Sequence, residues 1–148
     1  MHFDKASAAA AGSGDVTFHT LAGKPEHLYA YKGQVVILHR WGTWCAPCVL
    51  EMPAFQKLYD RYRNDPKVRF VVVASMNSPS EVAAFAGQHH YDLPFYIADD
   101  QDTGGVKVST FPTTMIYDKR SDIRMVQTGV TDWARPDIMA RIELLKQE

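Results

Sequence analysis

The stretch with the clearest capacity for chemistry is HRWGTWCAPC at residues 39–48, which contains both cysteines of the chain. Two cysteines separated by two residues can form a reversible disulfide, supply half of a metal site, or act as a structural staple. So small a loop constrains the unfolded chain very little, and 148 residues are enough to bury a core without a staple. Chemistry is therefore the better reason for the pair.

The elements around the pair predict how it is positioned. Val35–Trp41 begins as an uninterrupted apolar, β-branched run, which is typical of a strand covered on both faces. Apolar residues then recur with a period near 3.6 over Ala46–Tyr62, so a helix begins at the motif. Because a helix N-terminus stabilises a thiolate, Cys45 is expected to attack. Cys48, one helical turn further on, would resolve the mixed disulfide.

A metal site is the main alternative use of the two thiols. Structural zinc sites usually need four Cys or His ligands, and this chain has no second CxxC. His89 and His90 are adjacent, at no recognised ligand spacing, and are interpreted as surface residues at a helix end. We therefore expect no structural metal site, although reduced thiols suit Cu(I) and leave a copper-handling module as an alternative function.

The rest of the chain predicts alternating strands and helices, which favours a mixed α/β sheet with helices on both faces. A polar, turn-rich segment is expected at residues 99–105, and the helix that begins near residue 80 is expected to be capped by Ser78 or Ser80. The expected strands are residues 16–21 and 26–28 as a hairpin, 69–76, 94–98, and Thr113–Tyr117 with Ile123–Thr128 as a second hairpin; the further helices are 80–90 and 134–146.

Composition excludes several classes of function. A hydrophobic content of 46% with 22% charged residues is that of a globular domain, and a formal net charge of −1 gives no electrostatic reason to expect nucleic acid or an anionic membrane as partner. The sequence has no apolar run long enough for a membrane span and no secretory signal pattern. Residues 1–14 are expected to be a flexible tether or the remnant of a tag, and residues 15–148 the domain.

Widely separated motifs together resemble one known family. WGTWCAPC follows the strand, Glu51-Met52-Pro53 lies on the helix, and Phe111-Pro112-Thr113-Thr114 opens a late strand. From about residue 15 to its end the chain resembles the thioredoxin-like family, specifically the TlpA/ResA/CcmG (DsbE-like) branch of extracytoplasmic thiol-disulfide oxidoreductases. The resemblance implies a thioredoxin-like α/β fold with a central mixed β-sheet flanked by helices and an N-terminal β-hairpin. It also identifies residues 77–111 as the TlpA/ResA-type insertion that precedes a cis-proline.

The resemblance further implies which residues form the active site. Pro112 is expected to be cis and to lie against the disulfide, leaving an unpaired strand edge where a substrate segment can add. Glu51 matches the acidic residue that ResA-like members carry three positions after the second cysteine. It could accept a proton from the resolving thiol or stabilise its thiol form, or simply complement the helix dipole. The expected catalytic residues are Cys45, Cys48 and Glu51, supported by Trp44, Pro47, Phe111, Pro112 and His39.

Two residues depart from the family pattern. His39 occupies the position where thioredoxin has a buried Asp and many TlpA-like proteins have Asn. An imidazole beneath the disulfide could be a charge switch near neutral pH or a neutral hydrogen-bonding wedge. Arg40 points to the opposite face, where a buried guanidinium needs a partner, expected from an acidic residue of the helices or the C-terminal hairpin. Phe111 either narrows the substrate groove or packs as an ordinary core residue.

The expected function is that of a protein disulfide reductase acting through the Cys45-Cys48 dithiol, with no other cofactor. Ala46 and Pro47 add no cation or donor side chain to the motif, which favours a reductant over a strong oxidant. The resemblance implies client disulfides of the cytochrome c maturation or copper-site assembly type and an upstream membrane reductase. It also implies a periplasmic or other extracytoplasmic location, a membrane anchor before the domain, and a monomer. A Cu(I)-handling module, a more oxidising exchange protein and a cytoplasmic location are the alternatives.

Overall fold

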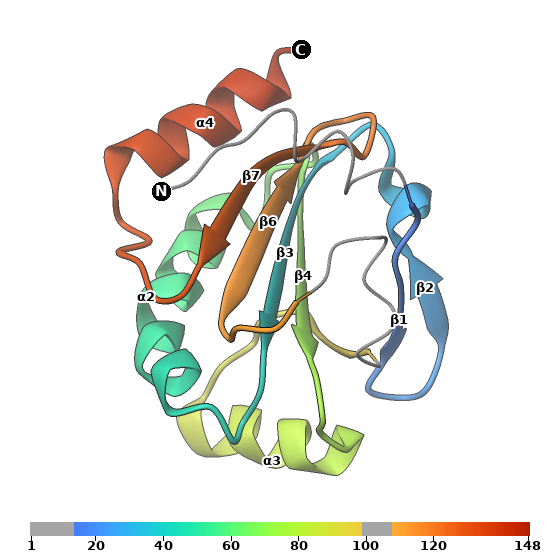
Figure 1. Cartoon of the computed structure of the whole chain (residues 1–148), viewed down its shortest axis with the longest axis vertical. Helices are drawn as coiled ribbons and strands as arrows, with labels where there is room; N and C mark the ends of the chain where they lie inside the picture. The colour runs from blue at the N-terminus through green and yellow to red at the C-terminus, as the bar shows by residue number, and fades with distance from the viewer. Residues whose placement is uncertain (1–13, 99–107) are drawn as a thin grey trace.

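The computed structural model describes residues 14–98 and 108–148 (Figure 1). The expected tether at residues 1–14, except for Gly14, and the expected polar turn at residues 99–105 therefore lie outside the described residues. In chain order the elements are β1 (Thr17–Thr20), β2 (Pro25–His27), the 3-10 helix η1 (Leu28–Tyr31), β3 (Val35–Trp41), α2 (Ala46–Tyr62), β4 (Val68–Ala74), α3 (Pro79–His89), β5 (Phe95–Ile97), β6 (Thr113–Tyr117), β7 (Ile123–Thr128) and α4 (Pro136–Lys146).

The strands of the described residues form one mixed sheet in the order β2-β1-β5-β4-β3-β6-β7. β3 pairs in parallel with β4 and antiparallel with β6, and all seven of its residues are buried. Because β6 is antiparallel to β3, the residues just before β6 lie at the end of the sheet where β3 terminates. The topology thus brings Pro112 to the same end of the sheet as Cys45, as Figure 1 shows for the strands themselves.

The α-helices share one face of the sheet. Side chains of α2, α3 and α4 are all buried in a cluster with the odd-numbered positions of β3. The cluster on the other face instead draws on β1 and η1. The prediction of helices on both faces is therefore wrong for the described residues. The chain steps from β3 to β4 to β5 in one direction across the sheet, and right-handed crossovers taken in one direction place both connecting helices on the same face.

Local signals set the ends of the helices. Cys45 is the N-cap of α2, and its Sγ accepts a hydrogen bond from the Cys48 N–H at 3.4 Å. Ser78 caps α3 through a capping box, in which its hydroxyl accepts from the Glu81 N–H and the Glu81 carboxylate accepts from the Ser78 N–H. This confirms one of the two expected caps.

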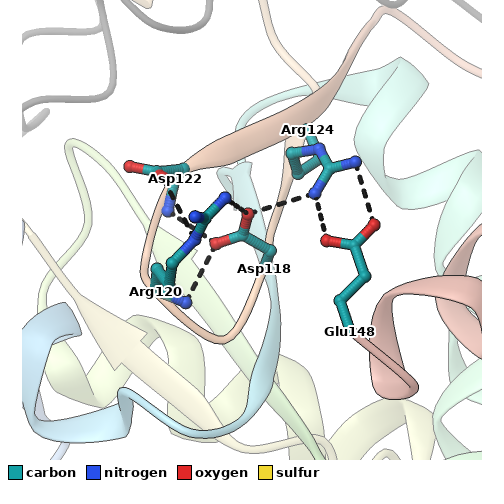
Figure 2. A network of polar contacts seen from close by, with 5 residues as sticks. All are labelled: Asp118, Arg120, Asp122, Arg124 and Glu148. Atoms are coloured by element: carbon teal, nitrogen blue, oxygen red, sulfur yellow. Dashed lines mark hydrogen bonds and ion pairs between the residues drawn. The ribbon is translucent and has the colours of Figure 1, made fainter.

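The turn of the β6–β7 hairpin lies at the opposite end of the sheet from the cysteines. A network of polar contacts holds it (Figure 2). The buried Asp118 carboxylate accepts from the backbone N–H groups of Arg120 and Asp122 and pairs with Arg124 at 3.2 Å. The Arg124 guanidinium in turn donates two hydrogen bonds to the Glu148 carboxylate. One arginine therefore ties the hairpin to the residues that follow α4.

None of the helices in residues 14–98 and 108–148 is both long enough and apolar enough to cross a membrane.

Candidate active site

The cysteines form a disulfide at the N-terminal tip of α2, with 5.3 Å between their Cα atoms. Cys45 retains 5% of its exposure, whereas Cys48 retains none. Of the two cysteines, the one at the helix cap is therefore the one that keeps contact with solvent. Pro47 lies in the first turn, where its missing N–H leaves no helical hydrogen bond unmade.

The loop that delivers Cys45 is fastened to the end of β4. The Thr43 N–H donates to Asn77 Oδ1 at 2.9 Å, and Asn77 Nδ2 donates to Thr43 Oγ1 at 2.7 Å. The Trp44 indole N–H donates to the Ser75 carbonyl at 2.9 Å. Sequence reasoning missed Ser75 and Asn77 as parts of the site. Their signal was their position directly after a parallel neighbour of β3, because the carboxyl ends of parallel strands meet at one edge.

Gly42 is required by this arrangement. A Cβ atom at Gly42 would collide with the indole of Trp44. The half-exposed Trp44 ring in turn packs edge-on against the ring of Phe111, with 5.3 Å between centroids. Trp44 and Phe111 thus form an apolar border beside the disulfide end of the sheet, a placement compatible with either expected use of Phe111.

The Phe111-Pro112 peptide bond is cis, as the resemblance implied. The carbonyl of Pro112 accepts from the Gly129 N–H at 2.8 Å, and the Thr113 hydroxyl donates to the Thr110 carbonyl at 2.5 Å. The first contact holds the start of β6 to the residue after β7, and the second closes the turn that precedes β6. Phe111 and Pro112 therefore lie at the end of the sheet where β3 terminates.

His39 and Glu51 meet where α2 packs on β3. His39 is fully buried on β3 and Glu51 is 3% exposed on α2, three residues after Cys48 and on the same side of the helix. The imidazole Nε2 lies 3.6 Å from Glu51 Oε1, while Glu51 Oε2 accepts from the Thr131 N–H at 2.8 Å. The imidazole Nδ1 lies 2.7 Å from the Thr114 hydroxyl, and its ring stacks on Phe55 with centroids 4.2 Å apart.

Burial shifts both groups toward their neutral forms. Desolvation lowers the pKa of His39 to about 3, so the imidazole is neutral at neutral pH. Desolvation also raises the pKa of Glu51, opposed by the Thr131 N–H and by the nearby Trp133 indole. Among the described residues Trp133 Nε1 has no hydrogen-bond partner of ordinary geometry, yet it lies close enough to the Glu51 carboxyl to favour the charged form. Of the two expectations for His39, the structure favours the neutral hydrogen-bonding wedge.

Arg40 is buried on the other face of the sheet, as alternation along β3 predicts. Its Nη2 donates to the Ser75 hydroxyl at 2.7 Å, and its charge lowers the pKa of the buried Tyr117, although desolvation prevails and raises that pKa. Among the described contacts its partner is the hydroxyl of Ser75, directly after β4, and the acidic partner expected from the sequence stays a prediction. Within the described ranges, no group of three or more His, Cys, Asp or Glu side chains could hold a metal ion.

Comparisons with known proteins agree with this geometry. The model of the Redoxin family matches residues 7–140. The chain is 32% identical over 147 residues to the thiol-disulfide oxidoreductase ResA of Geobacillus kaustophilus, covering 97% of this chain and 83% of ResA. It is 34% identical over 116 residues to the thioredoxin-like protein YneN of Bacillus subtilis, covering 78% of this chain and 68% of YneN.

A solved structure shares the fold. The crystal structure of a secreted thiol-disulfide isomerase from Corynebacterium glutamicum superposes with a TM-score of 0.77 at 26% identity, covering 90% of this chain and 84% of that one. The motif, the cis-proline and these likenesses agree on one conclusion. The chain belongs to the Redoxin family and is a thiol-disulfide oxidoreductase.

Proposed function

We propose that the chain works as a reductant of disulfides in client proteins. The Cys45 thiolate attacks one sulfur of a client disulfide, forming a mixed disulfide and releasing the other client sulfur as a thiolate. The Cys48 thiol then loses its proton and attacks Cys45, which releases the second client sulfur. Two electrons pass to the client, and the chain is left with the Cys45-Cys48 disulfide. The greater exposure of Cys45 supports its assignment as the attacking thiol.

The observation that supports the reducing direction is the charge of the buried polar residues near the two cysteines. Cys45 and Cys48 belong to a cluster of buried hydrophobic residues, and the buried polar residues that β3 and α2 place on that face are the neutral His39 and the acid Glu51. A cation beside Cys45 would stabilise its thiolate and make the disulfide more oxidising. Arg40, the cation nearest along β3, points to the opposite face. The helix end is then the main source of thiolate stabilisation, which favours a reducing pair.

Glu51 is proposed as the acceptor of the Cys48 proton. It lies one helical turn beyond Cys48 and is almost completely buried, so a carboxylate there meets little competition from water. Its raised pKa brings its proton affinity closer to that of a thiol, which eases the transfer. The alternative, a charge that only complements the helix dipole, fits poorly with a carboxyl buried against His39.

The client and the location are proposed from the relatives. ResA is named as a thiol-disulfide oxidoreductase, and the solved isomerase is described as secreted. We propose an extracytoplasmic location, clients of the cytochrome c maturation or copper-site assembly type, and an upstream membrane reductase that restores the dithiol. Trp44, Phe111 and Pro112 would form the surface on which the client segment lies.

Trapping tests the assignment of the two cysteines. A Cys48→Ala variant should accumulate a mixed disulfide with a disulfide-containing client peptide, because the resolving thiol is missing. Cys45→Ala is the matched control and should trap little. A second arm mixes the reduced wild-type protein with the oxidised peptide, and the oxidised protein with the reduced peptide. The first mixture should go nearly to completion and the second should barely react; the reverse preference contradicts the reducing direction.

A further inference from the structure

Three buried polar side chains from three elements form a row that begins one helical turn after Cys48. Glu51 comes from α2, His39 from β3 and Thr114 from β6, and none is more than 3% exposed. His39 and Thr114 are directly paired across the two strands. The imidazole therefore has the Thr114 hydroxyl 2.7 Å from one nitrogen and the Glu51 carboxyl 3.6 Å from the other.

The hydrogen-bonding needs of this row are only partly met. His39 Nε2 and Glu51 Oε1 are both buried, and neither makes a hydrogen bond within the described residues. They face each other at a separation slightly longer than a hydrogen bond. A buried polar atom without a partner destabilises the fold, so a small approach of Nε2 and Oε1 is favourable.

A neutral imidazole has one N–H, so the row has two complete arrangements. When Glu51 is charged, Nε2 must carry the hydrogen and donate to Oε1, while Nδ1 accepts from the Thr114 hydroxyl. When Glu51 is protonated, its O–H donates to Nε2, and Nδ1 carries the hydrogen and donates to Thr114 Oγ1. A hydroxyl can take either part, and this is why Thr114 can serve both arrangements.

Resting on the proposed role of Glu51 as proton acceptor, we propose that His39 and Thr114 are its positioning residues. The Thr114 hydroxyl allows both imidazole tautomers, and the imidazole gives Glu51 a hydrogen-bond partner in its charged and in its neutral form. During client reduction the Cys48 proton moves to Glu51 Oε1. As the imidazole changes tautomer it loses one proton from Nε2 and takes up one at Nδ1, so the row as a whole gains only the proton that Cys48 has lost. The proton leaves Glu51 again when the chain is next reduced.

A neighbour on β7 supports the neutral arrangement. Gln127 pairs directly with Thr114 across the strands, and its Oε1 is a buried acceptor without a hydrogen bond in the described residues. When Nδ1–H donates to Thr114, the hydroxyl hydrogen of Thr114 is free for this acceptor. Each N–H or O–H donor of the row then has an acceptor.

The described groups that surround His39 and Glu51 are either uncharged or already have partners of their own. On α2 the neighbours are Cys48 and the ring of Phe55; from the segment before α4 come the Thr131 N–H and the Trp133 indole. Arg135 donates to the Thr131 hydroxyl and pairs with Asp137, so its charge is already compensated. Asp132 accepts from the Ala134 N–H.

The test follows the Glu51 carboxyl directly in the oxidised protein, using 13C-labelled glutamate and a Glu51→Gln variant to assign its signal. Thr114→Val keeps the shape but removes the hydroxyl, which leaves Nδ1 unpartnered. A buried nitrogen without a partner is tolerated better as an acceptor than as an N–H donor. The imidazole hydrogen therefore moves from Nδ1 to Nε2, where it stabilises the Glu51 carboxylate. The acid dissociation constant of Glu51 should then rise about tenfold.

His39→Phe should change the dissociation constant in the other direction. It removes the donor that the carboxylate uses, and hydrogen bonds to charged groups are the stronger ones, so the constant should fall about tenfold. Thr114→Ser retains the hydroxyl and should match the wild type. Thr113→Val, the same change on the opposite face of β6, should also match it. A purely structural role predicts shifts of one sign, or none.

Wild-type protein supplies an independent readout should Thr114→Val fail to fold. The 15N signals of His39 should show the hydrogen on Nε2 at high pH and on Nδ1 once Glu51 is protonated. Both readouts use oxidised protein without a client, so they stand even if the reducing direction fails. The proposal is overturned by a tautomer that does not change as Glu51 titrates, or by a Thr114→Val constant within about twofold of the wild type.

Discussion

Replacing His39 by Gln should remove a large part of the acid sensitivity of the fold. The pKa of His39 is about 3 in the folded protein, against about 6.5 in an unfolded chain. A group whose pKa is lowered by folding contributes stability above its unfolded pKa, and that stability is lost as the pH falls toward the folded pKa. The affected window therefore runs from about pH 6.5 down to about pH 3.

The magnitude follows from linkage. Between pH 7 and pH 4.5 the unfolded chain binds a proton at this histidine and the folded protein does not, which lowers the free energy of unfolding by about 2.5 kcal/mol. Because pH 4.5 is above the folded pKa, this figure is set mainly by the ordinary pKa of the unfolded chain. Glu51 acts with the opposite sign, since its raised pKa makes the folded state bind the extra proton as the pH falls.

Urea unfolding of the oxidised protein measures the effect. The comparison uses Glu51→Gln and Glu51→Gln/His39→Gln, so that the carboxyl does not titrate in either protein. The single variant should lose about 2.5 kcal/mol more than the double variant between the two pH values, with unchanged m-values. Equal losses in the two proteins would mean that His39 is protonated in the folded state, which would refute the neutral, buried imidazole.

Three further variants test other parts of the site and fold. Glu51→Gln should slow the resolution of the mixed disulfide by about 10²–10⁴-fold and flatten its pH dependence in stopped-flow assays, because the acceptor of the Cys48 proton is gone. Gly42→Ala should displace the Trp44 indole, cost about 1–3 kcal/mol in urea unfolding and slow reaction with a client peptide. Arg124→Gln should cost about 1–3 kcal/mol by leaving the buried Asp118 short of a partner, without changing the reactivity of the cysteines.

Each of these variants has its own control or contrary outcome. A resolution rate that Glu51→Gln leaves unchanged across pH removes Glu51 from the proton transfer. Gly87→Ala is the matched control for Gly42→Ala, because a Cβ there meets nothing within 4 Å, and it should not destabilise the protein. Arg120 also contacts Asp118 but is 76% exposed, so Arg120→Gln should leave stability unchanged; a loss as large as that of Arg124→Gln contradicts the assigned roles.

Local patterns predicted the elements that present the cysteines. The bounds of β3 and α2 match the expectation because a run of apolar residues and a 3.6-residue period are both properties of neighbouring residues. The capping role of Cys45 follows from the same short stretch. The face on which α3 packs was not predictable in this way, since it depends on the order in which strands add to the sheet.

Long-range pairing explains what the sequence did not reveal about the site. The contact of His39 with Thr114 depends on the register between β3 and β6, and its approach to Glu51 depends on how α2 lies on the sheet. The contact of Arg40 with the Ser75 hydroxyl arises because β4 ends beside β3, which no local pattern encodes.

The reduction potential of the Cys45-Cys48 pair is the most direct test of the account. Equilibration with a dithiol buffer of known potential, followed by alkylation of the free thiols, measures it. With a neutral His39 and no cation between the two cysteines, the potential should lie near that of thioredoxin, about −270 mV. A potential near that of DsbA, about −120 mV, would contradict the reducing function.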